Sequence, residues 1–312
     1  MKDINERIGE IVISNGLEQA ESYLKKHLDC LILFNFRFNQ PIEDIYLDEA
    51  RLFSHVLFSK GLNILKLLEG VSYRSQLVNL NQIIDPLSIA VLVRNIYETT
   101  GLFNLIYRAH EGDDSKLIYL LWKASGLKYR QKFTVSNSSA ETMSKIEEEA
   151  EQLLSIEEEI KSNSTYLGFE EESRKVIDKA FRKKEYQFLI RDNHPKFVPW
   201  REVIDIMEFN SEYNSKIYSF LSLYAHPSNV SIFQFDQLFR KETMEFKGMS
   251  SFMINLASWL LSAFIADFVN LFPQTLAHFN ELELEDQVIV DFANRLKRNN
   301  NYSINDSYKS LE

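Results

Sequence analysis

The polar residues best placed to do chemistry are an arginine and a glutamate within one predicted helix. Arg94 and Glu98 are four residues apart, so their side chains share a helix face. The other residues on that face are Leu87, Val91, Gly101 and Leu105. Burying an ion costs several kcal/mol, so charge in an apolar stripe needs a specific reason. The pair is either an ion pair that fixes helix packing or part of a site that Gly101 leaves open to a ligand.

A histidine at the end of a later helix could complete such a site. Residues 211–225 are predicted to form a helix that Pro227 stops just after His226. The helix dipole and a nearby carboxylate would both favour a protonated imidazole. Small polar residues line one face of this helix and of residues 248–272: Ser215, Ser219 and Ser222 on the first, and Ser251, Asn255, Ser258 and Ser262 on the second. The two stripes predict either close helix packing or a polar channel that leads to His226.

Together, the two motifs resemble a bacterial protein family. Residues 93–98 (VRNIYE) and 218–228 (YSFLSLYAHPS) are similar to the Arg-x-x-x-Glu and Tyr-x-x-x-Ser-x-x-x-His patterns of the family called domain of unknown function 5677. The resemblance covers roughly residues 50–270 and implies a helical fold and a site, but no reaction. The matching residues are Arg94, Glu98, Tyr218, Ser222 and His226. A looser similarity connects the chain to the helical nucleases of toxin and phage-defence systems, although their arginine shortly before the histidine is missing here.

Three functions are compatible with these residues. The first is a helical module that binds an anionic small ligand through Arg94, or a protein partner. The residues that would line its site are Asn95, Tyr218, Ser222, Tyr224 and Ser228. The second is a metal-independent endoribonuclease of the toxin or phage-defence type, in which His226 is the acid and base and Arg94 stabilises the phosphate of the RNA. Glu98 would either orient His226 or hold Arg94 in place. The third is a purely structural polar network. Whether the protein is an enzyme, its substrate and its oligomeric state are all left open.

The composition and the absence of known motifs argue against several other classes of protein. There is no Gly-rich phosphate loop, dinucleotide fingerprint or His-Glu-x-x-His pair, and only one cysteine, Cys30, so we expect no cofactor or metal site. A net charge of −10 argues against a surface that grips nucleic acid all over, but it allows a local basic site. The charged N-terminus lacks a signal core, which favours a cytoplasmic location. The most apolar stretch, residues 252–272, contains Asp267, so we expect a core helix and no membrane contact.

The same composition predicts an all-α fold. With 9 glycines and 6 prolines in 312 residues, the chain should form long helices joined by short loops. We expect a single compact multi-helix bundle over residues 1–298 and a disordered tail over 299–312. Glutamate-rich residues 140–162 and mixed-charge residues 168–187 predict a protruding charged helical hairpin, inserted at 140–187, that could bind a protein partner.

Local signals place several boundaries of these elements. Asp85-Pro86 should cap one helix, and Asp113 or Asp114 the next. Alternating residues 34–38 fit either a short strand or a continued helix. Residues 188–200 should form an irregular loop, followed by helices at 201–208, 211–225, 248–272 and 274–298.

Overall fold

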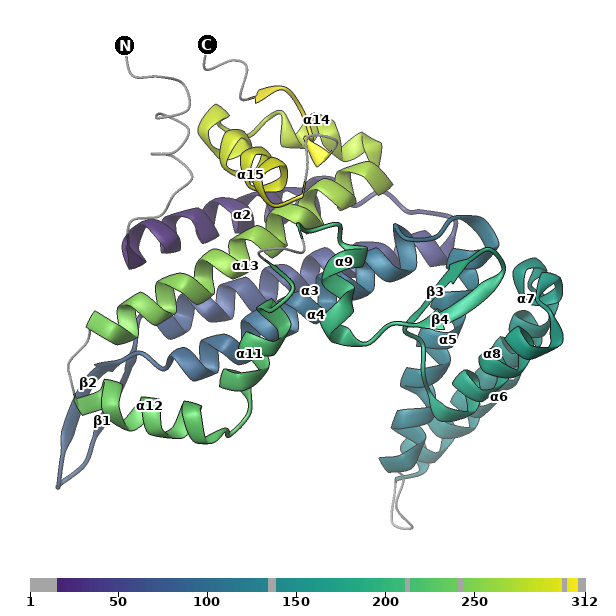
Figure 1. The fold of residues 1–312 in the computed structure, drawn as a ribbon, viewed down its shortest axis with the longest axis horizontal. Coiled ribbons are helices and arrows are strands. Elements are labelled where there is room, and N and C mark those ends of the chain that lie inside the picture. Colours follow the sequence, from purple (N-terminus) through teal and green to yellow (C-terminus); the bar gives the residue numbers. More distant parts are fainter. Residues whose placement is uncertain (1–15, 134–138, 211–213, 241–243, 299–301, 308–312) are drawn as a thin grey trace. The chain divides into compact units, whose positions relative to one another are not determined.

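The chain is all-α in the computed structural model, as the sequence predicted (Figure 1). The structure describes residues 16–133, 139–210, 214–240, 244–298 and 302–307. It divides into two compact units, one formed by residues 1–103 with 200–312 and the other by residues 104–199. The sequence had instead predicted one domain over 1–298, with only residues 140–187 set apart.

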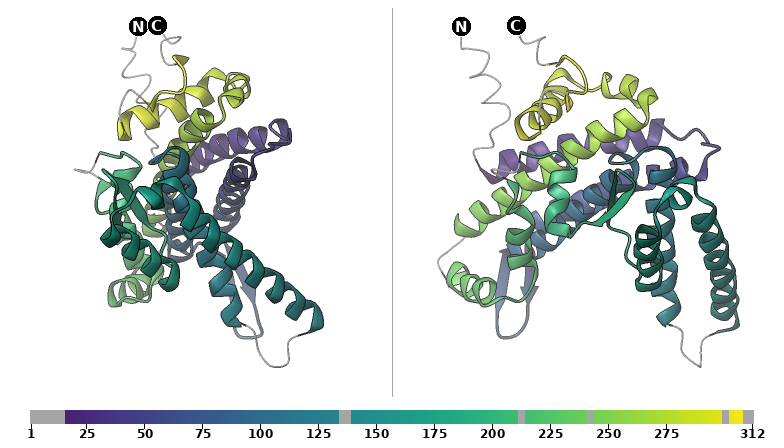
Figure 2. Two further views of the ribbon diagram at one scale, coloured as in Figure 1. Left: turned by 90° about the vertical axis from the view of Figure 1, so that its right-hand side faces the viewer. Right: turned by 45° about the vertical axis from the view of Figure 1, so that its right-hand side comes forward.

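The first unit is built from long helices. They are α2 (Leu17–Arg37), α3 (Ile45–Leu68), most of α4 (Pro86–Tyr107), α11 (Ile217–Ala225), α12 (Asn229–Arg240), α13 (Met244–Leu271) and α15 (Leu284–Lys297). Shorter elements are β1 (Val71–Arg74), β2 (Asn79–Ile83), η2 (Trp200–Glu202), α9 (Val203–Ile206), η3 (Pro273–Thr275) and α14 (Leu276–Phe279). Helix α2 packs against α3 and α13, and α13 also packs against α15, as the views in Figures 1 and 2 show. Residues 34–37 continue α2, so the helical alternative holds there.

Helix α13 supplies the centre of this unit. Its residues 246–271 are long and apolar enough to cross a membrane. However, 83% of an 18-residue apolar stretch within them is buried inside the protein, as in a core helix. Aromatic rings join it to its neighbours. The Phe34 and Phe268 rings stack with centroids 5.5 Å apart, and Phe264 meets the edge of Phe103 at 4.9 Å. Such pairs each add about 0.5–1.5 kcal/mol beyond their burial, so they fix how α2 and α4 pack on α13.

One residue of the small polar stripe of α13, Ser262, contacts α2. The hydroxyl of Ser262 lies 2.6 Å from Nε2 of His27, and the Asn294 amide donates to the Ser262 carbonyl at 2.6 Å. Both Ser258 and Ser262 are buried. The helices therefore pack closely at Ser262, and the Ser262 hydroxyl lies next to His27 rather than His226.

The C-terminal segment is held on α15 by a carboxylate. Asp291 accepts hydrogen bonds from the Ser303 hydroxyl and from the backbone amides of Ile304 and Asn305. Residues 302–307 are therefore packed on the first unit, although the sequence analysis placed them in a disordered tail. The other residues of that tail, 299–301 and 308–312, lie outside the described part of the chain.

The second unit is a helical cluster with one β-hairpin. It contains α5 (Gly112–Arg130), η1 (Gln131–Phe133), α6 (Ala140–Ser162), α7 (Ser164–Gly168), α8 (Glu171–Lys183), β3 (Phe188–Arg191) and β4 (His194–Phe197). Helix α5 contacts α6, α7 and α8, so the two predicted arms of the charged hairpin both pack on it. The prediction of an irregular loop over 188–200 was wrong, because β3 and β4 pair there as antiparallel strands. Asp192 and Asn193 make the turn with positive φ of 49° and 60°, which these residue types tolerate better than most.

The two predicted helix caps had different outcomes. Asp85 does cap α4, because its carboxylate accepts hydrogen bonds from the Leu87 amide at 2.9 Å and the Ser88 hydroxyl at 2.6 Å. Asp113 and Asp114 instead lie inside the first turn of α5, which begins at Gly112. Their side chains accept hydrogen bonds from the hydroxyls of Ser164 and Thr165, and so hold α7 against α5.

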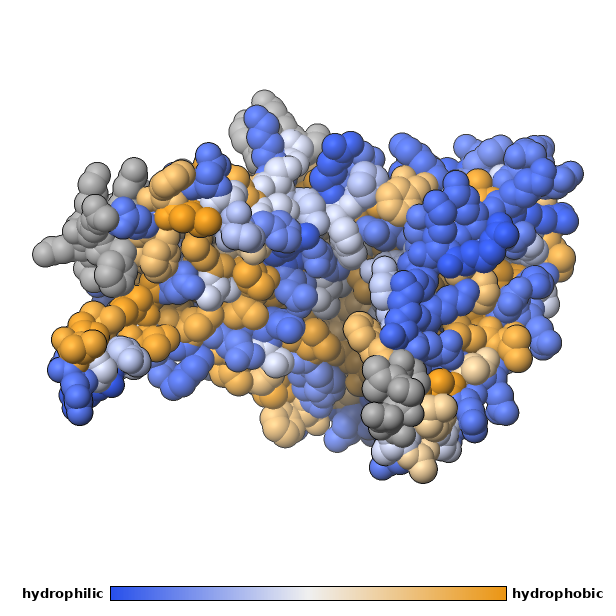
Figure 3. Space-filling model, turned by 90° about the horizontal axis from the view of Figure 1, so that it is seen from below, coloured by the Kyte–Doolittle hydropathy of each residue, from blue (hydrophilic) through white to orange (hydrophobic). Residues whose placement is uncertain are grey.

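Hydrophobic side chains also remain on the surface of the first unit. Figure 3 shows a hydrophobic patch at the left end of the molecule, the side on which β1, β2 and α12 lie in Figure 1. The exposed hydrophobic residues of these elements and of the turn between the strands include Leu77, Val78, Ile232 and Phe233. Helix α12 was not predicted from the sequence.

Candidate functional site

Arg94 and Glu98 lie on the less buried side of α4. Val93, Ile96 and Tyr97 of the same helix are fully buried, and they fix its rotation. The side chains of Arg94 and Glu98 are 20% and 26% exposed. The sequence placed the pair in a buried stripe, whereas the structure places it at the edge of the core, within reach of solvent.

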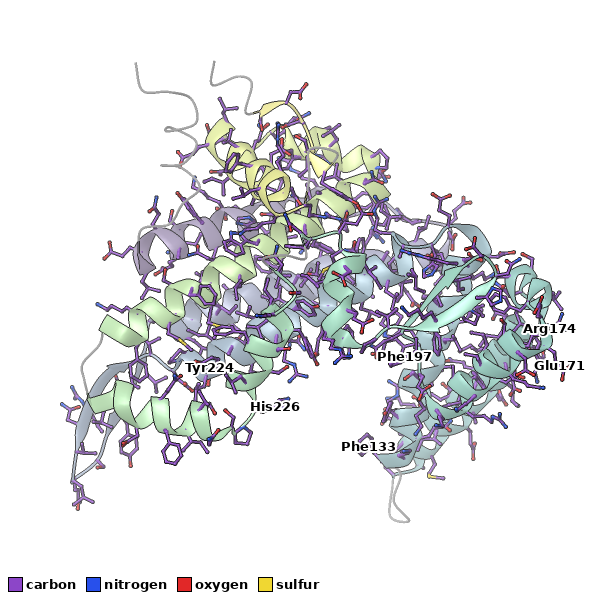
Figure 4. All side chains as sticks on the ribbon, in the orientation of Figure 1. Phe133, Glu171, Arg174, Phe197, Tyr224 and His226 are labelled. Carbon is purple, nitrogen blue, oxygen red and sulfur yellow. The ribbon has the colours of Figure 1, made fainter. Side chains whose placement is uncertain are left out.

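His226 follows α11 in an extended conformation. Its φ and ψ are −107° and 152°, the region that a residue before proline favours, and Pro227 therefore ends the helix as predicted. The backbone amide of His226 still donates to the Ser222 carbonyl at 3.2 Å. The side chain is exposed and is labelled at the end of α11 in Figure 4.

Arg94 links these groups into one cluster, which we call the Arg94 cluster: Arg94, Glu98, Tyr218 and His226. The Arg94 Nε donates to Glu98 Oε1 at 3.0 Å, and Nη2 donates to the Tyr218 hydroxyl at 2.7 Å. The Arg94 Nη1 contacts Nε2 of His226. The guanidinium carbon also lies 5.0 Å from the centre of the Tyr218 ring. Residues more than a hundred positions apart are thereby joined through one guanidinium group.

The contact between Arg94 and His226 fixes the role of the imidazole. A guanidinium group has only donors, so Nε2 of His226 must accept the hydrogen. The sequence predicted a nearby carboxylate beside His226, whereas the group that contacts the ring is the Arg94 guanidinium. Glu98 contacts Arg94 and, at 3.4 Å, the Tyr218 hydroxyl.

Tyr97 packs against Tyr218 of the Arg94 cluster, and the sequence did not predict a role for it. Its ring centre lies 5.4 Å from that of Tyr218, and its hydroxyl donates to the Trp200 carbonyl at 2.9 Å. Burial raises the pKa of the Tyr97 phenol, so Tyr97 acts as a neutral hydrogen-bond donor. The available signal was its position between Arg94 and Glu98 in the VRNIYE motif.

The other predicted site residues lie away from the Arg94 cluster. The Tyr224 hydroxyl donates to Gln234 at 2.7 Å and joins α11 to α12. Ser228 and Ser231 exchange backbone-to-hydroxyl hydrogen bonds and start α12. The Ser222 hydroxyl is buried without a hydrogen-bond partner in the described part of the chain. Among the same residues, no hydrogen bond joins Asn95 to the cluster.

Gly101 allows close packing rather than ligand approach. A Cβ atom at this position would lie 2.3 Å from Cγ1 of Val203, which is fully buried. The space that the glycine leaves is therefore filled by α9. In the residues that the structure describes, no group of three histidine, cysteine, aspartate or glutamate side chains could hold a metal ion.

Comparison with family models, with curated proteins and with solved structures gives no significant match. The resemblance to domain of unknown function 5677 therefore stays a prediction. What the Arg94 cluster does has to be argued from its own geometry.

Proposed function

We propose that the Arg94 cluster binds the anionic group of a small ligand, between Arg94 and His226. The observation that supports this proposal is the direct contact of Arg94 Nη1 with the exposed His226 ring. An anionic oxygen placed there would accept the hydrogen that His226 now accepts. The imidazole could then take up a proton and donate to the same oxygen.

The contacts of Arg94 already orient its guanidinium group for binding an anionic oxygen in place of His226. Three of its five N–H groups are used by Glu98, Tyr218 and His226, and the other two have no hydrogen-bond partner among the described residues. Glu98 fixes the orientation of the guanidinium plane, so less conformational entropy is lost on binding. The Tyr218 ring on one side of the guanidinium adds a cation–π contact.

The proposal predicts an anion affinity that depends on pH. Histidine side chains commonly change charge between about pH 5 and 8, and only a protonated His226 could donate from both ring nitrogens. An anion that binds together with one proton gains at most tenfold in affinity per pH unit. Inorganic sulfate is the suitable probe, because its own charge is constant over this range. We expect tighter sulfate binding at about pH 6 than at about pH 8.

Titration of sulfate into the protein at constant ionic strength, followed by NMR of the His226 ring, tests this. His226→Gln and Arg94→Lys should each weaken binding at least tenfold, because lysine keeps the charge but lacks the planar fork. Arg51→Lys is a matched control. Arg51 is 19% exposed, pairs with Asp48 and lies over the Phe38 ring, and in the described part of the chain no hydrogen bond joins it to a histidine. If sulfate binds equally to wild type and both cluster variants, the proposal is wrong.

A second candidate is the metal-independent endoribonuclease. The same contact favours it, because an imidazole next to a guanidinium combines an acid–base group with a phosphate-binding cation. Cleavage of total RNA by wild type and by His226→Ala tests this function. Equal cleavage by the two proteins would rule out the endoribonuclease function.

A purely structural role predicts a different result. The Arg94–Glu98 pair is partly exposed, and such pairs stabilise a protein by about 1 kcal/mol or less. Glu98→Ala should therefore change the free energy of unfolding only slightly if the cluster serves binding. A loss of several kcal/mol would instead assign the cluster to stability.

A further inference from the structure

The second unit carries two basic stretches that contain no acidic residue. Residues 123–133 include Lys123, Lys128, Arg130 and Lys132, and residues 179–184 include Lys179, Arg182, Lys183 and Lys184. The first stretch ends α5 and the second ends α8. Their place at helix C-termini suits the helix dipoles, but it does not by itself indicate a ligand.

Specific hydrogen bonds hold these two helix ends together. The Ser125 hydroxyl donates to the Lys184 carbonyl at 2.9 Å, and the Lys128 ammonium donates to the Phe181 carbonyl at 2.7 Å. The Lys128 Nζ also lies 3.1 Å from the centre of the Phe181 ring. The end of α8 is thereby fixed against the last turns of α5.

One result is that two lysines share a single aromatic ring. The Nζ atoms of Lys132 and Lys184 lie 5.5 Å and 4.8 Å from the centre of the Tyr129 ring. The nearby Lys132 ammonium lowers the pKa of Lys184, as expected for like charges in close proximity. An anion between the two ammonium groups would relieve this repulsion.

The aromatic groups beside these cations are open to solvent. Tyr129 is 52% exposed and Phe133 is 80% exposed. Phe133 projects from the end of η1 in Figure 4. Exposed aromatic faces next to paired cations are the combination on which single-stranded nucleic acid binds, with stacked bases and neutralised phosphates.

The backbone at Lys184 also argues for a function. Its φ is 66°, and it occupies the left-handed position after a helix that glycine most often fills. A side chain at such a position carries a conformational cost. Glycine would fit the backbone at this position better than lysine does.

We propose that the basic platform, defined as Lys128, Tyr129, Lys132, Phe133 and Lys184, binds single-stranded nucleic acid. Bases stack on Tyr129 and Phe133, and a phosphate lies between the ammonium groups of Lys132 and Lys184. The platform belongs to the second unit, so the proposal is independent of the one made for the Arg94 cluster. An acidic peptide would satisfy the lysines but would leave the two rings without a stacking partner.

Fluorescence anisotropy with a labelled single-stranded oligonucleotide of about 12 nucleotides tests the proposal. Tyr129→Ala should weaken binding roughly tenfold through lost stacking. Each phosphate contact on a single strand contributes about −0.7 to the slope of log K against log salt concentration. Because these two lysines hold one phosphate, replacing Lys132 and Lys184 together by glutamine should make the slope less negative by about 0.7.

Two further variants separate binding from folding. Lys184→Gly removes the ammonium and relieves the backbone, so it should weaken binding while keeping or raising the melting temperature. Lys123→Gln is the matched control, because Lys123 lies 5.4 Å from the centre of the Tyr119 ring on the same helix and is not part of the basic platform. We expect wild-type affinity for Lys123→Gln.

Two competition results would overturn the proposal. The first is equal displacement of the oligonucleotide by poly-glutamate and by an unlabelled single strand, which would show that charge alone is recognised. The second is unchanged affinity in Tyr129→Ala and in the Lys132/Lys184 double variant. Preference for the single strand over poly-glutamate and over a duplex of the same sequence is the supporting result.

Discussion

Acidification should destabilise the first unit through one buried histidine. His27 is 1% exposed, donates from Nδ1 to the Tyr23 carbonyl at 2.7 Å, and its Nε2 lies 2.6 Å from the Ser262 hydroxyl. Desolvation lowers its pKa from 6.5 to about 4. The folded protein therefore keeps His27 neutral where the unfolded chain would already be protonated.

The size of the effect follows from the two pKa values. The unfolded state binds more protons between about pH 6.5 and 4, so stability falls as the pH decreases through this range and levels off below it. The full shift corresponds to about 3 kcal/mol, and the step from pH 7 to pH 5 alone to about 2 kcal/mol. For a unit of this size, 2 kcal/mol lowers the melting temperature by roughly 4–8 °C.

Comparison of variants isolates the contribution of His27 from that of other titrating groups. Urea unfolding at pH 7 and pH 5 should show a loss in wild type that is about 2 kcal/mol larger than in His27→Gln. Glutamine does not titrate but can still donate and accept hydrogen bonds. His55→Gln, at an exposed position of α3, should keep the wild-type pH dependence. Equal losses in wild type and His27→Gln would refute the reasoning.

Two other predictions concern packing and charge in the same unit. Gly101→Ala should cost about 1–3 kcal/mol of stability, because its Cβ would overlap Val203, and adding Val203→Ala should recover at least part of this loss in a double-mutant cycle. Asp267 and Arg298 form an ion pair at 3.1 Å in which each side chain is 1% exposed. Asp267→Asn should therefore cost about 3–5 kcal/mol in urea unfolding, and loss of under 1 kcal/mol would contradict this.

Local signals in the sequence were sufficient for much of the fold. The scarcity of glycine and proline predicted long helices, and Asp85-Pro86 and Pro227 marked real helix boundaries. The i, i+4 spacing correctly placed Arg94 and Glu98 on one face. These features depend on residues within one or two helical turns, which is the range over which sequence patterns act.

Features that depend on distant partners could not be read in the same way. The spacing of the serines in α13 does not show which helix they face. Only the fold places Ser262 next to His27. The hairpin of β3 and β4 was missed because Pro195 lies within it, and proline is tolerated in such an isolated two-stranded sheet. No change in composition marks the boundary between the two units. Helix α4 runs across one of the boundaries without a break, so no loop signal is present there.

Two arginine–carboxylate pairs in the first unit show why burial decides the interpretation of the Arg94 cluster. Arg298 and Asp267 are sealed from solvent, so no ligand can reach them and their pairing serves the fold. Arg94 and Glu98 have the same chemistry but are 20% and 26% exposed, and an exposed histidine faces the guanidinium. Since partial exposure reduces what an ion pair adds to stability, it weakens the structural explanation while it allows a ligand to enter. Loss of the buried pair should therefore lower stability, whereas loss of the exposed pair should lower sulfate affinity, and the reverse pattern would assign the Arg94 cluster to the core.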